Sequence, residues 1–461
     1  MQRIDTCLSV QMDELMAELL NGGVSYRYTP NRFEALTGGG HPYPSPTRQI
    51  ETPTGPMIEE AIQPVLSPII LEHTEYYQLK RLAAAWPRWL NAQMAIVRRA
   101  RQGELAPEHT EQIHSLCTKN EWECALIDPG YQIIHPFVRL DAIRTPDGFK
   151  VMDINTTRPA GVGDLITATD FLNQYNTSYL LSFPTRRSFT DIVQRCINQW
   201  SSYQRLPGES IRLQVVIRSD DGDWRNFKTI ADCLTAAGIP STIVAPDEIQ
   251  SGAPTAIIRG RIKEGDPAYH LLLPGYPDER CILSPLHRRF LGNKVWMYLF
   301  RIEPYRTLFL QELGTADYQL LDSHFAEIGF VQGDQIVLPD QSVPLQYADK
   351  HDWVLKDPTS SSGRRMILGY TMSDQKWKQS LWNDVQNGWI AQRFYTNVEE
   401  RLVADPSGQP MPQKLFTKYG IYIFGDQLGG LEFHARTHPV VHGARNAYFN
   451  PVFRVNHPPH G

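Results

Sequence analysis

Four polar residues lie in two short segments of the chain, Arg139 and Asp141 in QIIHPFVRLDAIR and Asp153 and Asn155 in GFKVMDIN. Both segments are rich in β-branched and apolar residues, and the TPDG between them is typical of a hairpin turn. Side chains two residues apart on a strand point to the same face of a sheet. A hairpin would therefore bring one guanidinium, two carboxylates and one amide oxygen together.

This set of side chains suits the binding of Mg²⁺ and phosphate. Magnesium prefers oxygen ligands and usually completes its coordination with phosphate oxygens and water. The alternative is a solvated strand face with an Arg–Asp surface pair, which is common and contributes little to stability. The hairpin alone leaves both interpretations open.

Two lysines further along the chain stand where phosphate could be bound. Lys356 ends the apolar segment HDWVLK, and the loop DPTSSSGRR after it holds Ser361, Ser362 and Gly363. The backbone N–H groups of such a loop can approach phosphate closely, and a lysine adds positive charge. Lys294 opens an expected amphipathic helix, where a cation is unfavourable unless an anion is present. An exposed hairpin lysine and a lysine without function near a helix start are the alternatives.

The elements that must position these residues fall into four regions, which together indicate an α/β (α+β) protein. Residues 1–130 are expected to be mainly helical over 1–20 and 58–119, with the Gly/Pro-rich stretch TGGGHPYPSPTRQIETPTGP as a surface loop or a lid. Residues 131–205 hold the hairpin and two helices near 164–173 and 189–200. Residues 206–290 are expected to form a small parallel α/β unit, and residues 291–461 a second α+β region with strands in HDWVLK, NGWIAQRFY and LFTKYGIYIFGDQLGGLEFHART.

Composition excludes several classes of function. The formal net charge of −5 and the pI near 6.3 give no electrostatic reason to expect a nucleic-acid or membrane partner. No apolar run is long enough to span a bilayer, and the N-terminus lacks the layout of a signal peptide. The six cysteines form no C-x-x-C pair, so neither a zinc site nor a disulfide framework is indicated. A cytoplasmic location is the expectation.

The order of the motifs resembles that of the circularly permuted ATP-grasp family, the glutathionylspermidine synthetase-like carboxylate–amine ligases. That order is R-x-D, (D/E)-x-N, a small α/β unit ending in IIRGRI, G-N-K, a strand with a lysine and a small-residue loop, and W-I-A-Q. It extends from about Pro136 to Phe453. The resemblance implies that residues 206–290 are a pre-ATP-grasp-like domain, and that the part with the metal ligands precedes the nucleotide-binding part.

The resemblance also implies roles for individual residues. Asp141, Asp153 and Asn155 would hold Mg²⁺, Arg139 would contact the transferred phosphate, Lys294, Lys356, Ser361, Ser362 and Gly363 would bind ATP phosphates, Gln392 would lie in the segment next to adenine, and Arg436 would contact phosphate or an intermediate. The chain departs from the family at Asp153, where a glutamate is frequent, and in the loop SSSGRR, where more glycines are usual.

The activity implied by the resemblance is ligation of a carboxylate to an amine with ATP and Mg²⁺. The carboxylate would be activated as an acyl phosphate with release of ADP, and an amide or peptide bond with an amino acid would form. Two alternatives stay open: loading of an amino acid onto the thiol of a carrier protein, and a nucleotide-binding scaffold without turnover, which the altered SSSGRR loop would favour. The N-terminal region, which the resemblance does not cover, is the expected specificity element.

Two further patterns allow a functional and a purely structural interpretation. His434, His438 and His442 recur every four residues, which suits zinc ligands on a helix, but Pro439 and the β-rich context argue against a helix. Trp86 and Trp89, followed by a basic run at 98–101, fit either a partner surface or an amphipathic helix with a solvated face.

Overall fold

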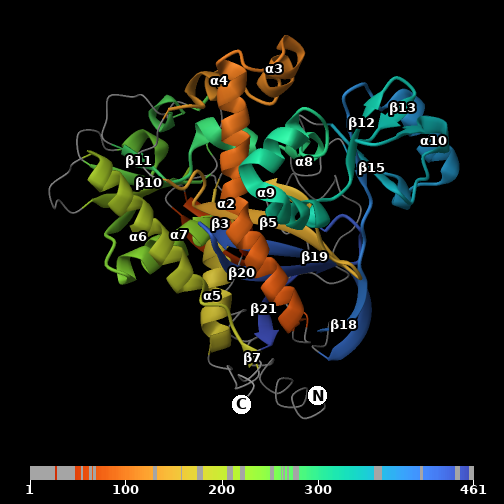
Figure 1. The fold of residues 1–461 in the computed structure, drawn as a ribbon. Coiled ribbons are helices and arrows are strands. Elements are labelled where there is room, and N and C mark those ends of the chain that lie inside the picture. The colour runs from red at the N-terminus through yellow and green to blue at the C-terminus, as the bar shows by residue number, and fades with distance from the viewer. Residues whose placement is uncertain are drawn as a thin grey trace, which may run out of the picture.

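A computed structural model describes the chain over residues 26–28, 47–52, 55–61, 65, 69–127, 132–156, 158–173, 180–204, 211–218, 224–249, 254–260, 262, 265–266, 269–273, 280–357, 366–404, 409–441 and 447–455. Over these residues the fold is a mixed α/β arrangement of several sheets and helices (Figure 1).

The largest sheet is built from segments far apart in the sequence and lies at the centre of the molecule (Figure 1). Its strands are β4 (Ile69–Leu71), β21 (Tyr448–Val455), β20 (Gln427–Arg436), β19 (Pro410–Phe424), β5 (Phe137–Thr145) and β6 (Gly148–Asn155), in that spatial order, with β18 (Val398–Ala404) on β19 and β7 (Leu180–Leu181) on β21. The two hairpins expected from the sequence, β5–β6 and β19–β20, are confirmed. They are also neighbours, because β5 pairs with β19.

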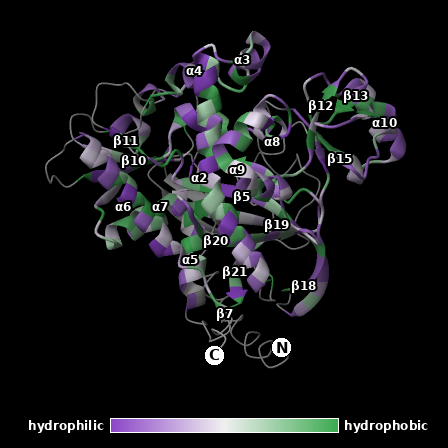
Figure 2. Ribbon diagram, in the orientation of Figure 1, coloured by the Kyte–Doolittle hydropathy of each residue, from purple (hydrophilic) through white to green (hydrophobic). Residues whose placement is uncertain are grey.

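Two long helices, α2 (His73–Arg101) and α9 (Tyr305–His324), pack on one face of this sheet. Buried residues recur along α2 every three or four positions, and Figure 2 shows its hydrophobic and hydrophilic residues side by side. The buried hydrophobic residues of α2 belong to the same hydrophobic cluster as Leu140 of β5 and Ile421 of β19. Each such buried side chain contributes about 1.5–3 kcal/mol. Because side chains alternate along a strand, this packing directs Arg139 and Asp141 to the other face.

A four-stranded parallel sheet forms the small α/β unit. Its strands are β11 (Arg280–Ile282), β10 (Thr255–Arg259), β8 (Arg212–Val216) and β9 (Ser241–Val244), in that order. All three pairings are parallel, as the sequence predicts. Helix α7 (Trp224–Ala236) joins β8 to β9, and α5 (Val162–Leu172) and α6 (Thr185–Gln204) correspond to the two helices expected after the first hairpin.

A six-stranded antiparallel sheet with its own hydrophobic cluster lies to one side (Figure 1). Its strands are β14 (Ser342–Pro344), β13 (Gln335–Val337), β12 (Ile328–Gln332), β17 (Ile390–Arg393), β15 (Trp353–Lys356) and β16 (Met366–Leu368), in that order, and it carries α10 (Asp374–Asn383). The expected strands around Lys356 and Gln392 are confirmed as β15 and β17. They pair with each other directly.

The N-terminal region differs from the prediction of a helical segment starting at residue 58. Strands β1 (Tyr26–Tyr28), β2 (Thr47–Thr52) and β3 (Gly55–Ala61) form an antiparallel sheet, so β2 and the start of β3 fall within the expected Gly/Pro-rich loop. Three of the six residues in TRQIET are β-branched, a weak strand signal that the surrounding glycines and prolines obscured. The helix expected over 1–20 lies outside the described residues.

From His73 onward the N-terminal region is helical as predicted, with α3 (Pro107–His114) and α4 (Lys119–Cys124) after α2, whereas β4 (Ile69–Leu71) lies within the segment expected to be helical. Trp86 and Trp89 are fully buried, so they belong to the core and do not form a partner surface. In the part of the chain that the structure describes, no helix combines the length and apolarity that crossing a bilayer requires.

Candidate functional site

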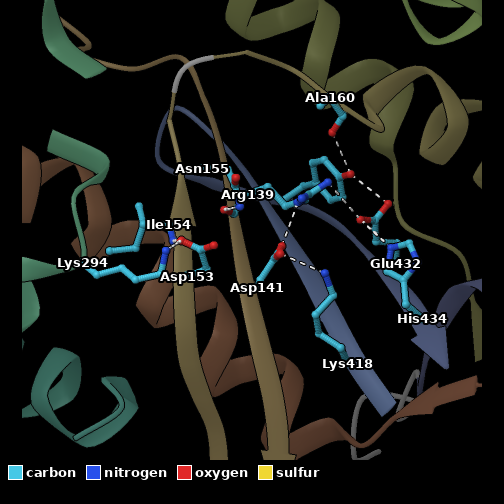
Figure 3. A network of polar contacts seen from close by, with 11 residues as sticks. Arg139, Asp141, Asp153, Ile154, Asn155, Ala160, Lys294, Lys418, Glu432 and His434 are labelled. Carbon is cyan, nitrogen blue, oxygen red and sulfur yellow. Dashed lines mark hydrogen bonds and ion pairs between the residues drawn. The ribbon is translucent and has the colours of Figure 1, made fainter. Parts of the chain in front are cut away.

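The β5–β6 hairpin brings the four polar residues singled out in the sequence together. Arg139 is the Cα partner of Asn155, and Asp141 that of Asp153, so all four lie on one face (Figure 3). The register shifts between Asp141 and Ala142, which leaves Met152 as an extra residue on β6. Such a bulge re-aims the side chains beside it and is frequent near functional sites.

Asp141 lies between two cationic side chains. Its Oδ1 accepts a hydrogen bond from Nε of Arg139 at 2.9 Å, and its Oδ2 accepts one from Nζ of Lys418 at 2.8 Å. Burial alone would raise the pKa of this carboxyl, but the charges of Arg139 and Lys418 outweigh it and hold the pKa well below its usual value. Asp141 is therefore ionised at neutral pH.

Lys418 was not identified from the sequence, although a signal for it exists. It lies on β19, where Lys418, Gly420 and Tyr422 alternate with buried apolar residues, and Gly420 is the Cα partner of Asp141. The pattern marks one polar face of β19. It does not reveal that this face adjoins Asp141, because that depends on how β19 pairs with β5.

Arg139 also belongs to a buried network on β19 and β20. Its Nη1 lies 3.5 Å from Oε1 of Glu432, and the Tyr422 hydroxyl donates to Oε2 of Glu432 at 2.8 Å. The Nε2 of His434 lies 2.8 Å from the same Oε1. Burial opposes ionisation of Glu432, but the charges of His434 and Arg139 lower its pKa. The guanidinium of Arg139 is thus held by two carboxylates (Figure 3).

Two glycines make room for this network. A Cβ on Gly420 would lie 2.6 Å from Oε1 of Glu432, and one on Gly161 would lie 2.3 Å from the Tyr422 hydroxyl oxygen. Gly161 also has a φ of 83°, which side chains disfavour. The Tyr422 hydroxyl lies 3.1 Å from the carbonyl oxygen of Ala160. The turn that follows Asn155 is therefore fixed against the same face of the sheet.

Lys294 reaches the hairpin from a different element. Its Nζ lies 2.6 Å from Oδ1 of Asp153 (Figure 3). The prediction of an amphipathic helix after it is wrong: α8 (Val295–Leu299) has only five residues, and all of them are buried. The sequence VWMYL has apolar or aromatic residues on every side of the helix, which fits a helix that is buried all round.

Lys356 and Gln392 connect the six-stranded sheet to the hairpin. The Nζ of Lys356 donates to Oε1 of Gln392, and Nε2 of Gln392 donates to the carbonyl oxygen of Met152 at 3.0 Å. Burial lowers the pKa of Lys356 to about 8, and the nearby charge of Lys294 acts in the same direction. Two lysines, on β15 and before α8, therefore lie near the carboxylates of β5 and β6.

One further predicted residue, Arg436, lies in the described part of the chain. Arg436 ends β20, and its Nη1 donates to the carbonyl oxygen of Val440 at 2.9 Å. Ser361, Ser362 and Gly363 lie outside the described residues. His434 is on a strand, as the sequence argument against a helix predicted, His438 follows that strand, and His442 lies outside the described residues.

The donor set on the hairpin fits a hard divalent cation bound together with phosphate. Asp141 and Asp153 supply carboxylates from facing positions, and Nδ2 of Asn155 donates to the carbonyl of Arg139 at 3.4 Å, which leaves its amide oxygen for a metal. Among the described residues, no three His, Cys, Asp or Glu side chains form a metal-binding group. A small number of protein ligands is what Mg²⁺ needs when phosphate oxygens and water supply the rest.

Comparison with known proteins gives a fold and no family. No protein-family model matches the chain, and no curated protein matches its sequence. Among solved structures, a glutathione synthetase-like effector from Globodera pallida in its apo form aligns over 86% of this chain and 90% of its own, with a TM-score of 0.52 and 9% identity. A putative gamma-glutamylcysteine synthetase from Methylobacillus flagellatus aligns over 79% of this chain and 86% of its own, with 12% identity but a TM-score of only 0.32. The chain thus shares the fold of the first.

Proposed function

We propose that this protein is an ATP-dependent, ADP-forming ligase of the circularly permuted ATP-grasp type, which joins a carboxylate to the amine of an amino acid. The observation that carries the proposal is that lysines and carboxylates from distant segments of the chain lie close together. Lys294 contacts Asp153, and Lys356 is close enough to Lys294, Asp153 and Asp141 for their charges to act on its pKa. A fold shared with a glutathione synthetase-like protein is consistent with this chemistry.

The residues divide into two groups by charge. Asp141, Asp153 and Asn155 would hold Mg²⁺, which would supply positive charge to the phosphates of ATP. Lys294 and Lys356 would bind the phosphates of ATP, and Gln392 would orient Lys356 through the hydrogen bond between them. Transfer of a phosphoryl group between anions requires alignment and charge neutralisation more than covalent participation of the protein.

Arg139 is proposed to bind the phosphoryl group that is transferred. A carboxylate oxygen of the acid substrate would attack the γ-phosphorus, the bond to the ADP oxygen would break, and the amine would then displace phosphate from the acyl carbon. Arg139 is suited to this role because Asp141 and Glu432 fix its guanidinium while a side-chain exposure of 23% leaves part of it accessible. Arg436, which lies on the same face of β20 as Glu432, is proposed to contact phosphate or an intermediate.

The experiment that tests the proposal is a screen of carboxylic acids against amines in the presence of ATP and Mg²⁺. ADP and phosphate should form only when both an acid and an amine are present, and the Lys356→Ala variant should be inactive. Formation of AMP and pyrophosphate would contradict the proposal. If the wild type and Asp153→Ala bind ATP equally well and neither forms ADP with any pair, the protein is a nucleotide-binding scaffold.

Loading of a carrier protein is the alternative acceptor chemistry. Intact-protein mass spectrometry of a candidate carrier, incubated with the enzyme, ATP and an amino acid, separates the two acceptors. A mass increase equal to one aminoacyl group, removed by hydroxylamine, indicates a thioester. An unchanged carrier together with a new small-molecule amide indicates the proposed ligase.

A further inference from the structure

A buried arginine at the end of β10 lacks an acidic partner among the described residues. The side chain of Arg259 donates from Nε to the carbonyl oxygen of Ser284 at 2.9 Å and from Nη1 to that of Gly260 at 3.2 Å. Among the described residues, its buried Nη2 has no hydrogen-bond partner, and the whole residue is only 3% exposed. No carboxylate in the described part of the chain forms an ion pair with it.

Most of the ionisable groups that act on Arg259 add positive charge. Burial and the charges of Arg158 and Arg289 together lower its pKa to about 9, against a smaller opposing effect of Tyr269. Arg289 belongs to the 3₁₀ helix η6 (Leu286–Gly292), and its half-exposed side chain donates to Glu121. His287 of the same helix is buried, and neither of its ring nitrogens has a hydrogen-bond partner. The cluster extends from exposed Arg289 to buried Arg259.

Such an arrangement is costly unless an anion completes it. Burying a charged group costs several kcal/mol when no opposite charge compensates it. The bond to Ser284 connects the end of β10 to the segment after β11, but a neutral glutamine could make a similar bond without this cost. A guanidinium pairs best with a planar carboxylate, which it can bind through two parallel hydrogen bonds.

The cluster adjoins the proposed metal site. Arg158 follows Asn155 on the same segment, and a Cβ on Gly292 of η6 would lie 2.8 Å from Oγ1 of Thr156. The segment after β6 therefore packs directly on η6, and η6 leads to Lys294.

We propose that Arg259, with Arg158 beside it, binds a carboxylate of a substrate, and that this carboxylate is distinct from the one that is activated. The inference rests on the proposed ligase function and narrows its substrate class. At least one substrate then carries a spectator carboxylate: the amine, if it is an α-amino acid, or the acid, if it is a dicarboxylate.

Calorimetric titration of the full-length protein without ATP or Mg²⁺ tests this inference. Glycine and glycinamide form one pair of probes, for the amine substrate, and glutarate and glutaramate form the other, for the acid. The proteins are the wild type, Arg259→Gln, Arg158→Gln and the matched control Arg212→Gln. Arg212 is exposed on β8, in the same sheet but at the opposite strand end.

In at least one pair, the probe with the additional carboxylate should bind at least about tenfold more tightly than its amide counterpart. This holds for the wild type and for Arg212→Gln, because the amide cannot form the charged hydrogen-bonded pair with the arginine. Arg259→Gln and Arg158→Gln should lose this preference. The pair that shows it identifies which substrate carries the carboxylate. Absence of any preference in the wild type, or its retention in Arg259→Gln, would overturn the inference.

The folding of Arg259→Gln is checked by thermal unfolding. Removing an uncompensated buried charge should leave the melting temperature unchanged or raise it. If Arg259→Gln nevertheless fails to fold, the test relies on Arg158→Gln. A retained preference of this variant for the carboxylate probe overturns the inference, and a lost preference supports it. The binding assay is independent of catalysis. A clear carboxylate preference without ADP formation for any substrate pair would therefore contradict the proposed ligase activity alone.

Discussion

Lys294 and Asp153 form an ion pair of 2.6 Å between a residue before α8 and a residue on β6. It joins a residue proposed to bind phosphate to one proposed to bind metal. Asp141 is likewise held by Arg139 and Lys418. The cations of the site thus balance its carboxylates. Binding of Mg²⁺ together with ATP would exchange these pairings, because the phosphates can bind the cationic side chains while the metal binds the carboxylates.

Replacement of Asp153 by asparagine tests whether this balance serves catalysis. The change preserves the shape of the side chain and removes its charge, so the metal loses an anionic ligand and Lys294 loses the charge with which it pairs. We expect Mg²⁺-dependent ADP formation to fall on the order of 100-fold. The melting temperature should change little, because the pair is partly exposed, with side-chain exposures of 23% for Lys294 and 39% for Asp153.

The matched control is Asp374→Asn. Asp374 also pairs with a lysine, Lys350, at 2.7 Å, but its side chain is 79% exposed on α10. Its replacement should leave ADP formation unchanged. If Asp153→Asn retains the wild-type rate over a range of Mg²⁺ concentrations, Asp153 is not a metal ligand.

Replacement of Gly420 by alanine tests the packing that holds Arg139. The added Cβ would lie 2.6 Å from Oε1 and 2.7 Å from Cγ of Glu432, so this buried carboxylate must move away from Arg139. Overpacking of this kind costs about 1–3 kcal/mol in the free energy of unfolding. Chemical denaturation measures that cost, and kcat for ADP formation should fall with it.

A second substitution separates crowding from other effects of alanine. Glu432→Asp shortens the side chain and should relieve the contact in the Gly420→Ala background. The double variant should therefore be more stable than the sum of the two single changes implies. Strict additivity would mean that the Cβ of residue 420 does not press on Glu432.

The sequence predicted local pairing well, because a strand period of two and a TPDG turn are short-range signals. They specify the β5–β6 hairpin and the shared face of Arg139, Asp141, Asp153 and Asn155. Lys418 and Glu432 were missed for a physical reason. Their proximity to Asp141 and Arg139 depends on β19 pairing with β5, a contact between distant segments that no local pattern specifies.

The two wrong predictions have local causes. Strand β2 was hidden by the prolines and glycines around it, although three of its six residues are β-branched. The helix after Lys294 was expected to be amphipathic, yet α8 is buried all round, so its apolar residues have no preferred face. The prediction for Lys294 rested on its place at a helix start and on the G-N-K motif, and neither depends on the helix being amphipathic.

Two fully buried tryptophans, Trp296 in α8 and Trp86 in α2, allow a test of how much one hydrogen bond of α8 contributes to stability. The indole Nε1 of Trp296 donates to the carbonyl oxygen of Phe290 at 3.0 Å, whereas the Nε1 of Trp86 in α2 has no hydrogen-bond partner among the described residues. Trp296→Phe should therefore destabilise the protein by about 1 kcal/mol more than Trp86→Phe, the typical net value of one hydrogen bond. Denaturant unfolding gives both values, and equal costs would contradict a contribution from this bond.

The last prediction concerns the protonation of Lys356. Burial and the charge of Lys294 lower its pKa to about 8, so the side chain is largely neutral at pH 8.5. Phosphate favours the charged form and raises the pKa again. ATP binding at pH 8.5 should therefore take up a substantial fraction of one proton, whereas binding at pH 6.5 should take up almost none at this residue.

Calorimetric titrations of ATP in buffers of different ionisation enthalpy measure this uptake directly. The Lys356→Arg variant is the matched control, because arginine remains charged at both pH values and should show no additional uptake at pH 8.5. The same depressed pKa affects stability: charged Lys356 costs stability below about pH 8, and the cost declines as the pH rises through that value. Relative to wild type, Lys356→Met should therefore gain more stability at pH 7 than at pH 9. Equal proton uptake by wild type and Lys356→Arg at pH 8.5 would show that Lys356 does not meet the phosphates of ATP.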